Sequence, residues 1–317
     1  MNHNILVLGG TGFVGRAVCE KLSERSADGR VLVPTRRVQN AVRVRALPTV
    51  QVVPANVHDD ADLARLVAGC DAVVNLVAIL HGSAAEFERV HVALPKRLAQ
   101  ACKAAGVQRL VQVSALGVGP GAPSNYLRSK TAGEAVLQAA GLDLTLLRPS
   151  VIFGAEDRFL NLFAQLQALA PFIPLAGSAA RFQPVWVDDV ASAIVTCLDK
   201  MDCIGKIYEC TGPAVYTLSQ LVHLAGEWSG HDRPQFALPN ALARLQALAM
   251  ELLPGVPLMS RDNLDSMRVA NVASGKLPGL AALAITPTAL EAVAPGYLGA
   301  TFGRARLERW RAGAGRG

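Results

Sequence analysis

The sequence predicts an α/β protein built on a doubly wound parallel sheet, with a smaller α+β cap region in its second half. Two observations lead to this prediction. A short apolar run near the amino terminus leads directly into a glycine-rich turn, and apolar runs then alternate with helical patterns as far as residue 150. Strict alternation of strands and helices is typical of βαβ units, whose strands pair in parallel.

The first apolar run and its turn have the pattern of a phosphate-binding loop. Ile5–Leu8 is followed by Gly9, Gly12 and Gly15, and apolar residues at helical spacing come next. The first glycine allows a tight turn, the second lets backbone approach a pyrophosphate, and the third lets the helix pack against the strand. The free N–H groups of the helix N-terminus favour the anion. The pattern therefore predicts a Rossmann-type dinucleotide site; the alternative is a plain glycine-rich β–α turn.

Composition excludes several classes of protein. The chain has 317 residues, of which 51% are hydrophobic and 18% charged, which is typical of a globular protein. Its six cysteines are scattered without a Cys-x-x-Cys pair, so we expect free thiols in a reducing cytoplasm and no metal site. No run reaches the ~18 apolar residues of a membrane span. Because the first strand is predicted to begin at Ile5, we expect no signal peptide.

The net charge of +6 does not by itself indicate a nucleic-acid partner. Basic residues are spread along the chain, with local excess only at 36–45 and 304–316. We therefore expect no nucleic-acid partner, and instead a protein with phosphate-facing or anion-facing patches.

Residues 1–150 are expected to form the nucleotide-binding domain. We expect its later strands at 31–34, 50–53, 72–77, 110–113 and 144–147. Helices are expected at 62–67, over 87–105 with a kink or restart at Pro95, and from a cap at Ser124. Asn75 is expected at the strand end where open parallel sheets bind ligands.

The remaining residues, 151–317, are expected to form mostly the substrate or cap region. Helices are expected at 159–170, 190–198 and 218–228, and strands at 182–187 and 207–209. Asp188 or Asp189 is expected to cap the helix at 190–198. The segment 182–198 is predicted to pack back on the first domain.

Two arginines follow the second strand, where an acid would bind the ribose of NAD. Arg36 and Arg37 stand there instead, and a guanidinium fork suits a 2′-phosphate. This favours NADP(H) as the cofactor, with NAD(H) possible. The alternative is a solvated basic loop.

A tyrosine and a lysine occur at i and i+4 on one predicted helix face, Tyr126 and Lys130. A neighbouring ammonium stabilises a phenolate, so we expect it to lower the pKa of the tyrosine from its ordinary value near ~10. The phenol then exchanges a proton with a substrate oxygen during hydride transfer. Ser114, at the end of the preceding strand, is predicted to bind the same oxygen. The alternative is an ordinary surface pair.

Two segments are candidates for contact with a membrane or a partner. In 234–259, leucines fall on one helical face, from Leu238 through Leu242 and Leu245 to Leu252. We favour a core helix of the cap; the alternative is an interfacial helix or a lid over an apolar substrate. The basic tail at 304–316 is the second candidate, with simple solvation as its alternative. The expected location is cytoplasmic, possibly peripheral to the inner membrane face.

Several motifs together resemble those of extended or atypical short-chain dehydrogenases/reductases. They are Gly-Gly-Thr-Gly-Phe-Val-Gly at 9–15, Tyr-x-x-x-Lys at 126–130, Arg-Pro-Ser-Val-Ile-Phe-Gly at 148–154 and Gln-Pro-Val-Trp-Val-Asp-Asp-Val-Ala at 183–191. Within that superfamily, the runs 156–161, 261–262 and 285–290 resemble bacterial relatives of the accessory NAD(P)H-binding subunit of respiratory complex I. The resemblance covers almost the whole chain.

The resemblance implies a bound NADP(H) and a set of residues around it. Around the pyrophosphate it places Gly9, Thr11, Gly12, Phe13, Val14 and Gly15. At the 2′-phosphate it places Arg36, with Arg37 beside it, and at the adenine Asn56 and Val57. Near the nicotinamide and its ribose it places Ala78, Ser114, Tyr126, Lys130, Pro149, Ser150 and Val151.

Three functions follow from these features. The first is an NADP(H)-dependent oxidoreductase that acts on an apolar carbonyl, alcohol or quinone-like compound. The second is a nucleotide-binding accessory or assembly protein of a respiratory or quinone-synthesis complex. The third is an epimerase or dehydratase. The Ser-Ala-Leu-Gly-Val-Gly run at 114–119 departs from the signature of the superfamily's sugar-nucleotide enzymes, which counts against a nucleotide-sugar substrate.

Overall fold

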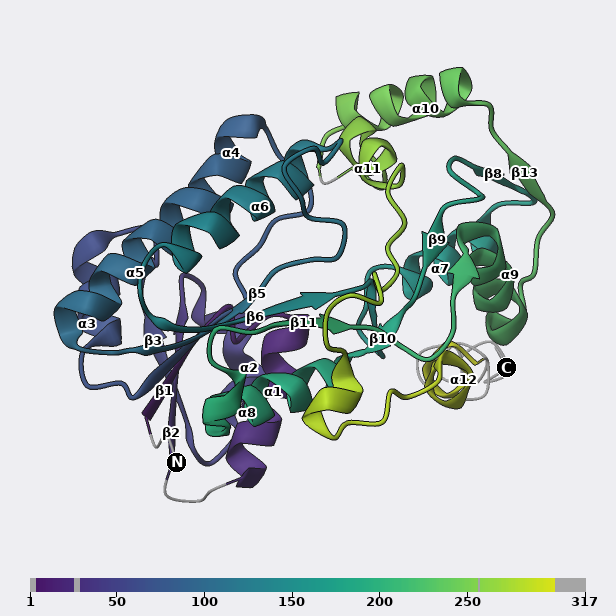
Figure 1. The fold of residues 1–317 in the computed structure, drawn as a ribbon. Coiled ribbons are helices and arrows are strands. Elements are labelled where there is room, and N and C mark those ends of the chain that lie inside the picture. Colours follow the sequence, from purple (N-terminus) through teal and green to yellow (C-terminus); the bar gives the residue numbers. More distant parts are fainter. Residues whose placement is uncertain (1–3, 26–28, 256, 300–317) are drawn as a thin grey trace. The chain divides into compact units, whose positions relative to one another are not determined.

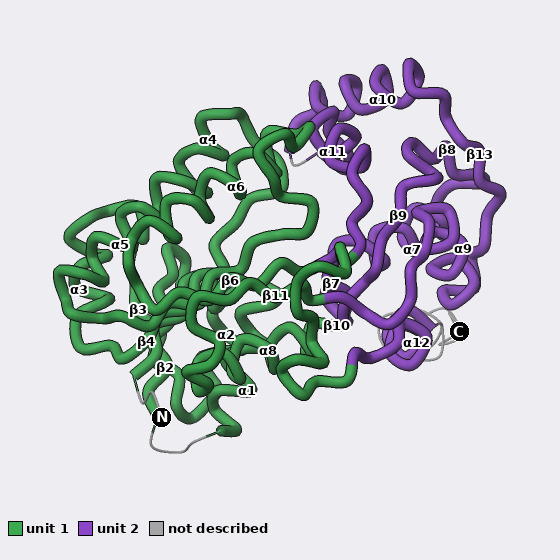
Figure 2. Tube along the Cα trace, in the orientation of Figure 1, with its two compact units in different colours: residues 1–149, 187–210, 273–286 green, residues 150–186, 211–272, 287–317 purple. Residues whose placement is uncertain are grey.

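The computed structural model describes residues 4–25, 29–255 and 257–299 (Figure 1). They form two compact units (Figure 2). Unit 1 comprises Met1–Pro149, Val187–Cys210 and Ala273–Thr286, and unit 2 comprises Ser150–Trp186, Thr211–Val272 and Pro287–Gly317. The basic tail considered above lies outside the described residues.

Unit 1 is organised around a seven-stranded sheet in the order β11-β6-β5-β4-β1-β2-β3, in which all neighbours pair in parallel. Its strands are β1 (Asn4–Leu8), β2 (Arg30–Thr35), β3 (Val50–Pro54), β4 (Ala72–Asn75), β5 (Arg109–Val113), β6 (Asp143–Pro149) and β11 (Ile207–Cys210). The predicted doubly wound parallel sheet is confirmed. The apolar runs form its central strands because helices cover both faces and leave their side chains dry.

Two layers of helices enclose this sheet, with α3, α5 and α6 on one face and α1 and α8 on the other (Figure 1). The helices are α1 (Phe13–Arg25), α2 (Val42–Arg45), α3 (Asp60–Val67), α4 (Ala84–Glu88), α5 (Leu94–Ala105), α6 (Asn125–Gln138) and α8 (Val187–Asp199). Short 3₁₀ turns are η1 (Val38–Ala41), η3 (Met201–Cys203) and η4 (Leu280–Leu283). Leucines and valines of the sheet, α3 and α5 form the main core of this unit.

The predicted helix over 87–105 is interrupted by a π-helical turn, η2 (Arg89–Ala93), between α4 and α5. Pro95 follows this π turn, and the backbone stays helical through Ala93 and Leu94. The kink or restart predicted at Pro95 therefore takes the form of a change of helix type, and the sequence did not indicate the π turn. The cap at Ser124 is confirmed, since its side chain accepts from the Leu127 N–H.

A buried arginine ties β5, β6 and α8 together. The Arg109 guanidinium donates to the Thr145 hydroxyl at 2.7 Å and to the backbone carbonyls of Asp143 and Cys197. Burial lowers the pKa of this group. Carbonyl oxygens take the place of a carboxylate partner here, so the charge is compensated by dipoles of three separate elements.

Unit 2 has three two-stranded sheets, and α7 and α9 pack together in its core. Its strands are β7 (Ile152–Phe153) with β10 (Val185–Trp186), β9 (Arg181–Phe182) with β12 (Tyr216–Thr217), and β8 (Ile173–Leu175) with β13 (Gln235–Ala237). Its helices are α7 (Leu160–Leu169), α9 (Leu218–Ser229), α10 (Asn240–Leu252), α11 (Arg261–Ser266) and α12 (Leu290–Leu298).

Two predictions at the junction near residue 187 are wrong. The single strand expected at 182–187 is two short strands, β9 and β10, in different sheets. Pro184 lies between them and has no N–H for a ladder. Asp188 and Asp189 lie inside the first turn of α8 and do not cap it. Their charges still favour the helix N-terminus.

The leucine face of α10 is exposed, contrary to the predicted core helix. Leu242, Leu245 and Leu252 are 53%, 61% and 78% exposed, whereas the small residues Ala243 and Ala247 are buried. Alanines allow close packing, so the helix contacts its neighbours through its small side chains. Within 4–25, 29–255 and 257–299, no helix is long and apolar enough to cross a membrane.

Candidate functional site

The glycine turn between β1 and α1 is a backbone structure that only glycine permits. Gly9 has φ +83°, and the Gly12 N–H donates to its carbonyl at 2.9 Å. A Cβ at Gly15 would lie 2.2 Å from the Gly9 carbonyl oxygen, a distance that no side chain can occupy. The helix therefore begins directly against the strand end, as the spacing predicts.

This turn presents the groups that a diphosphate requires. The first N–H groups of α1, from Phe13 onward, have no intrahelical acceptors, and the helix dipole adds partial positive charge. Arg16 donates from Nε to the Gly12 carbonyl at 3.3 Å. Burial and then the nearby Arg43 charge lower the pKa of Arg16, so two cations lie near each other beside the turn.

The predicted adenosine residues follow the ends of neighbouring strands of this sheet. Arg36 and Arg37 follow β2 and are exposed, and Thr35 Oγ1 bonds both the N–H and the carbonyl of Arg37. Asn56 follows β3, where its N–H donates to Asp62 at 2.8 Å. Val57 beside it packs against the core and Ala78, after β4, is exposed. Parallel strands bring all these positions to one edge of the sheet.

Of the predicted catalytic residues, Ser114 directly follows β5, and Tyr126 and Lys130 lie on α6. Lys130 is buried, and its Nζ donates to the Val113 carbonyl at 3.2 Å. Val113 is the residue directly before Ser114 in the chain. The Ser114 hydroxyl is buried and has no hydrogen-bond partner among the described residues. Both side chains line a cavity of about 10 Å³, the space of roughly one water molecule. Buried hydroxyls are usually hydrogen-bonded, so Ser114 Oγ is available to a polar group that enters this cavity.

The predicted lowering of the tyrosine pKa is not found in the protein alone. Burial raises the pKa of Tyr126 to about 12. Burial also lowers the pKa of Lys130 to about 8, against the opposing effect of the Glu134 charge. The ammonium is held by the Val113 carbonyl, and desolvation is the cause of the raised pKa of Tyr126. The phenol is therefore protonated at neutral pH.

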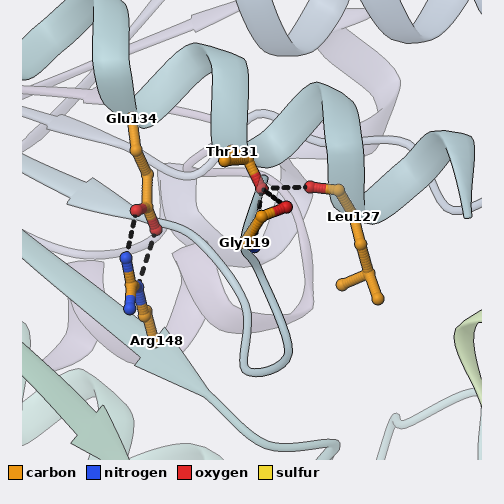
Figure 3. Close-up of polar contacts among 5 residues, drawn as sticks. All are labelled: Gly119, Leu127, Thr131, Glu134 and Arg148. Atoms are coloured by element: carbon orange, nitrogen blue, oxygen red, sulfur yellow. Dashed lines mark hydrogen bonds and ion pairs between the residues drawn. The ribbon is translucent and has the colours of Figure 1, made fainter. Parts of the chain in front are cut away.

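Glu134 extends this face of α6 by one more turn. Its carboxylate receives both Nε and Nη2 of Arg148, at 3.0 and 2.5 Å, as Figure 3 shows. The same figure shows Thr131 Oγ1 joined to the Leu127 carbonyl and to the backbone of Gly119, which fixes the loop before α6. These contacts hold α6 against β6 and its own preceding loop.

A chain of buried amides that sequence reasoning missed runs from β4 to Lys130. Asn75 donates to the Gln112 side-chain carbonyl at 2.8 Å, and Gln112 donates to the Val113 carbonyl at 2.8 Å. That carbonyl also accepts from Lys130. Asn75 ends β4, as expected, and its side chain is fully buried. Two polar residues inside adjacent apolar strands were the available signal.

His91 and Asn271 are two further residues that the predicted site lacked. His91 is buried in the π turn and its ring contacts that of Tyr126 edge-on, with centroids 5.5 Å apart. Asn271 binds residues predicted near the nicotinamide: its Oδ1 accepts from the Ser150 hydroxyl at 2.6 Å and from the Val151 N–H at 2.9 Å. Pro149 ends β6 in unit 1, whereas Ser150 and Val151 open unit 2.

No group of three or more potential metal ligands occurs in the described part of the chain.

Residues 5–210 match the model of a protein family described as the NAD dependent epimerase/dehydratase family. The chain belongs to this family. The match covers the glycine turn, the parallel sheet and the Tyr126–Lys130 pair, which is the part whose geometry is described above.

Named relatives extend the comparison. The chain is 32% identical over 292 residues to "NADH dehydrogenase [ubiquinone] 1 alpha subcomplex subunit 9, mitochondrial" of Mus musculus, covering 90% of this chain and 77% of that protein. It is 32% identical over 193 residues to "Ceramide reductase" of Caulobacter vibrioides, covering 60% and 59%. A nucleoside-diphosphate-sugar epimerase structure from Staphylococcus aureus has TM-score 0.72 at 18% identity, covering 91% and 98%, and shows the shared fold.

The buried ammonium predicts a pH dependence of stability. Since the pKa of Lys130 is lowered to about 8, the folded protein binds fewer protons than the unfolded chain between about pH 8 and the unfolded value of ~10.4. The free energy of unfolding of the wild type should therefore rise through this window relative to Lys130→Met, by on the order of 3 kcal/mol. Urea unfolding at pH 7 to 10 measures it; parallel profiles would contradict the assignment.

Proposed function

We propose that this protein is an NADP(H)-dependent oxidoreductase that acts on an apolar carbonyl, alcohol or quinone-like compound. The observation that carries the proposal is the unpartnered, buried hydroxyl of Ser114 beside Lys130, with Tyr126 one turn earlier on α6. A hydroxyl donor, a phenol and an ammonium at the carboxyl edge of a dinucleotide-binding sheet are the groups needed to protonate a substrate oxygen.

The residues present fit the cofactor. Gly9, Thr11, Gly12, Phe13, Val14 and Gly15 are the pyrophosphate-binding residues of this proposal. When bound, the dinucleotide supplies or accepts the hydride. The nearest obstacle to a Cβ at Gly12 is the Gly9 carbonyl at 3.2 Å, so this glycine leaves its outer side open for a ligand.

The pKa directions favour reduction of a carbonyl. With a pKa of about 12, the Tyr126 phenol holds its proton at neutral pH and acts as a donor. Ser114 hydrogen-bonds the same substrate oxygen, and the Lys130 ammonium stabilises the phenolate that remains after proton transfer. The "Ceramide reductase" similarity supports a reductase acting on an apolar compound.

The nucleotide preference depends on the end of β2. Arg36 and Arg37 are exposed where an acid would bind a ribose, so we assign the 2′-phosphate of NADP(H) to Arg36 with Arg37 beside it. NAD(H) is the weaker alternative. The family's description names NAD, so this preference is a property proposed for this chain.

Replacing the phenol tests the chemistry. Tyr126→Phe should lower NADPH-dependent reduction of candidate quinones and hydrophobic ketones by ~10²-fold or more, because it removes the group proposed to donate the proton. NADPH affinity should stay within ~3-fold, since the phosphates bind elsewhere. Stopped-flow absorbance of NADPH measures turnover. Tyr216→Phe, in unit 2, is the matched control, and equal activity of the two variants would overturn the role of Tyr126.

Reversing the charge at position 36 tests the nucleotide preference. Arg36→Asp should weaken NADPH binding by ~10²-fold and change NADH binding little, because only NADPH carries the 2′-phosphate. Calorimetric titration with each nucleotide measures this difference. Lys96→Asp, at an exposed position on α5, controls for the change in net charge. An equal loss for both nucleotides would remove the assignment.

A second candidate function is an accessory role in a respiratory or quinone-synthesis complex. The similar mitochondrial protein is named as a subunit of NADH dehydrogenase, and the exposed leucines of α10 form an apolar face suited to a partner. In this role the bound nucleotide stabilises the fold without turnover. Contact through 234–259 would place the chain beside a membrane complex.

The epimerase or dehydratase reaction is a third alternative, within the scope of the family description.

The accessory role makes its own prediction. Leu245→Glu combined with Leu252→Glu should shift the chain in native gels of gently solubilised cells from a large assembly to its free mass, because charges disrupt an apolar interface. NADPH binding should be unchanged. Met201→Glu, at an exposed position in unit 1, is the control. Wild-type protein migrating only at its free mass would contradict the accessory role.

A further inference from the structure

The imidazole of His91 connects three separate elements of unit 1. Its Nε2 accepts from the Ile79 N–H at 3.2 Å, and its Nδ1 lies 2.8 Å from the Ser129 hydroxyl. Ser129 donates its single proton to the Tyr126 carbonyl at 2.8 Å. The histidine therefore joins the segment after β4 to the first turn of α6, where the predicted catalytic residues begin.

These contacts determine the tautomer of the ring. A backbone N–H can only donate, so Nε2 must be the acceptor. The Ser129 proton is directed to the Tyr126 carbonyl, so the serine oxygen receives the Nδ1 proton. Burial, and then the Lys130 charge, lower the pKa of His91 to about 3. The ring is therefore neutral at any pH where the protein works, and it carries one defined proton.

The same ring limits where the tyrosine can lie. His91 contacts Tyr126 edge-on, at 82° between the ring planes, and Phe87 contacts it with centroids 6.2 Å apart. Edge-to-face contacts of this kind favour one ring orientation. The rings of His91 and Phe87 also contact each other, with centroids 5.6 Å apart. Two rings from α4 and the π turn thus flank the phenol.

A glycine holds the π turn and α6 at this separation. A Cβ at Gly133 would lie 1.9 Å from the His91 carbonyl oxygen, so no side chain fits there. The π turn bulges the helix at the same residue, and such bulges are frequent at functional sites. His91 also lines the cavity that contains the Ser114 and Lys130 side chains.

From these contacts we infer that His91 is a positioning residue for Tyr126: its ring, held in place by the Ile79 N–H and the Ser129 hydroxyl, sets the orientation of the phenol. It does not exchange a proton with substrate, because its nitrogens are engaged by Ile79 and Ser129. The inference rests on the proposed function, in which Tyr126 is the proton donor. It adds a residue outside the Ser114, Tyr126 and Lys130 set, and explains why a neutral histidine is buried beside a buried lysine.

The test follows Tyr126 directly, without requiring turnover. Full-length protein is labelled with 13Cζ-tyrosine, and the Tyr126 resonance among the four tyrosines is assigned by Tyr126→Phe. Two variants break the link. His91→Phe keeps an aromatic ring and removes both hydrogen bonds that hold it, and Ser129→Ala removes the hydrogen bond between the His91 ring and α6.

In both variants the Tyr126 titration midpoint should fall by about one unit toward the ordinary value of ~10, because a phenol without fixed orientation reaches solvent. Its resonance should also broaden. His91→Gln, whose amide supplies a donor and an acceptor but no ring, should lower the midpoint as well, because the ring contact with the phenol is lost. Where turnover is measurable, kcat should fall about tenfold in the disrupted variants with KM unchanged.

Two outcomes would overturn the inference: an unchanged Tyr126 titration in both His91→Phe and Ser129→Ala, or an unchanged titration in His91→Gln. If one variant fails to fold, the others still decide. Failure of the proposed function is recognised separately, because it appears as wild-type protein that binds no NADPH or that binds it without turnover, and the Tyr126 titration requires neither. NADPH affinity should stay within ~3-fold in all three variants, since the glycine turn is unaltered.

Discussion

The described geometry depends on two places where a helix comes nearer to neighbouring backbone than any side chain permits. Gly15 brings α1 onto the Gly9 carbonyl, and Gly133 brings α6 onto the His91 carbonyl. The first contact directs unpaired N–H groups of a helix toward the edge of the sheet, where a diphosphate can bind. The second places the Tyr126 and Lys130 face of α6 against the π turn. Both halves of the site therefore follow from close backbone packing.

Burial then sets the chemistry of the groups that this packing brings together. Lys130 remains charged near neutral pH because the Val113 carbonyl and the Glu134 charge oppose the cost of desolvation. Desolvation raises the pKa of Tyr126, so the phenol keeps its proton at neutral pH. His91 is neutral for the same reason. The proposed site thus has one cation, Lys130, and two neutral hydroxyl donors, Tyr126 and Ser114. This combination is suited to giving a proton to an oxygen that gains charge.

The sequence was sufficient to predict the sheet, because alternation of apolar runs and helical patterns is a local signal. It was also sufficient to predict the glycine turn, since the spacing of Gly9, Gly12 and Gly15 reports a backbone requirement. The predicted site residues of unit 1 follow adjacent strand ends or lie on α6. The strand ends are close together because parallel strands share one carboxyl edge. The role of these residues in catalysis and nucleotide binding is still a prediction.

What the sequence did not indicate depends on contacts between distant residues. The link from Asn75 through Gln112 to Val113 joins β4, β5 and α6, and no local pattern encodes such a pairing. The direction of the Tyr126 pKa shift depends on how deeply the phenol is buried. The leucines of α10 were expected inside because leucine usually is; the helix instead packs through Ala243 and Ala247. Periodicity defines two faces without saying which of them is covered.

Native mass spectrometry of the intact protein with NADPH tests the central claim, nucleotide binding at the glycine turn, most directly. The comparison is wild type against Gly12→Asp, which adds a carboxylate where the diphosphate would lie. The account predicts one dinucleotide bound per chain in the wild type and none in the variant at the same concentration. Wild-type protein that binds no dinucleotide, or a variant that binds it equally well, would contradict the account.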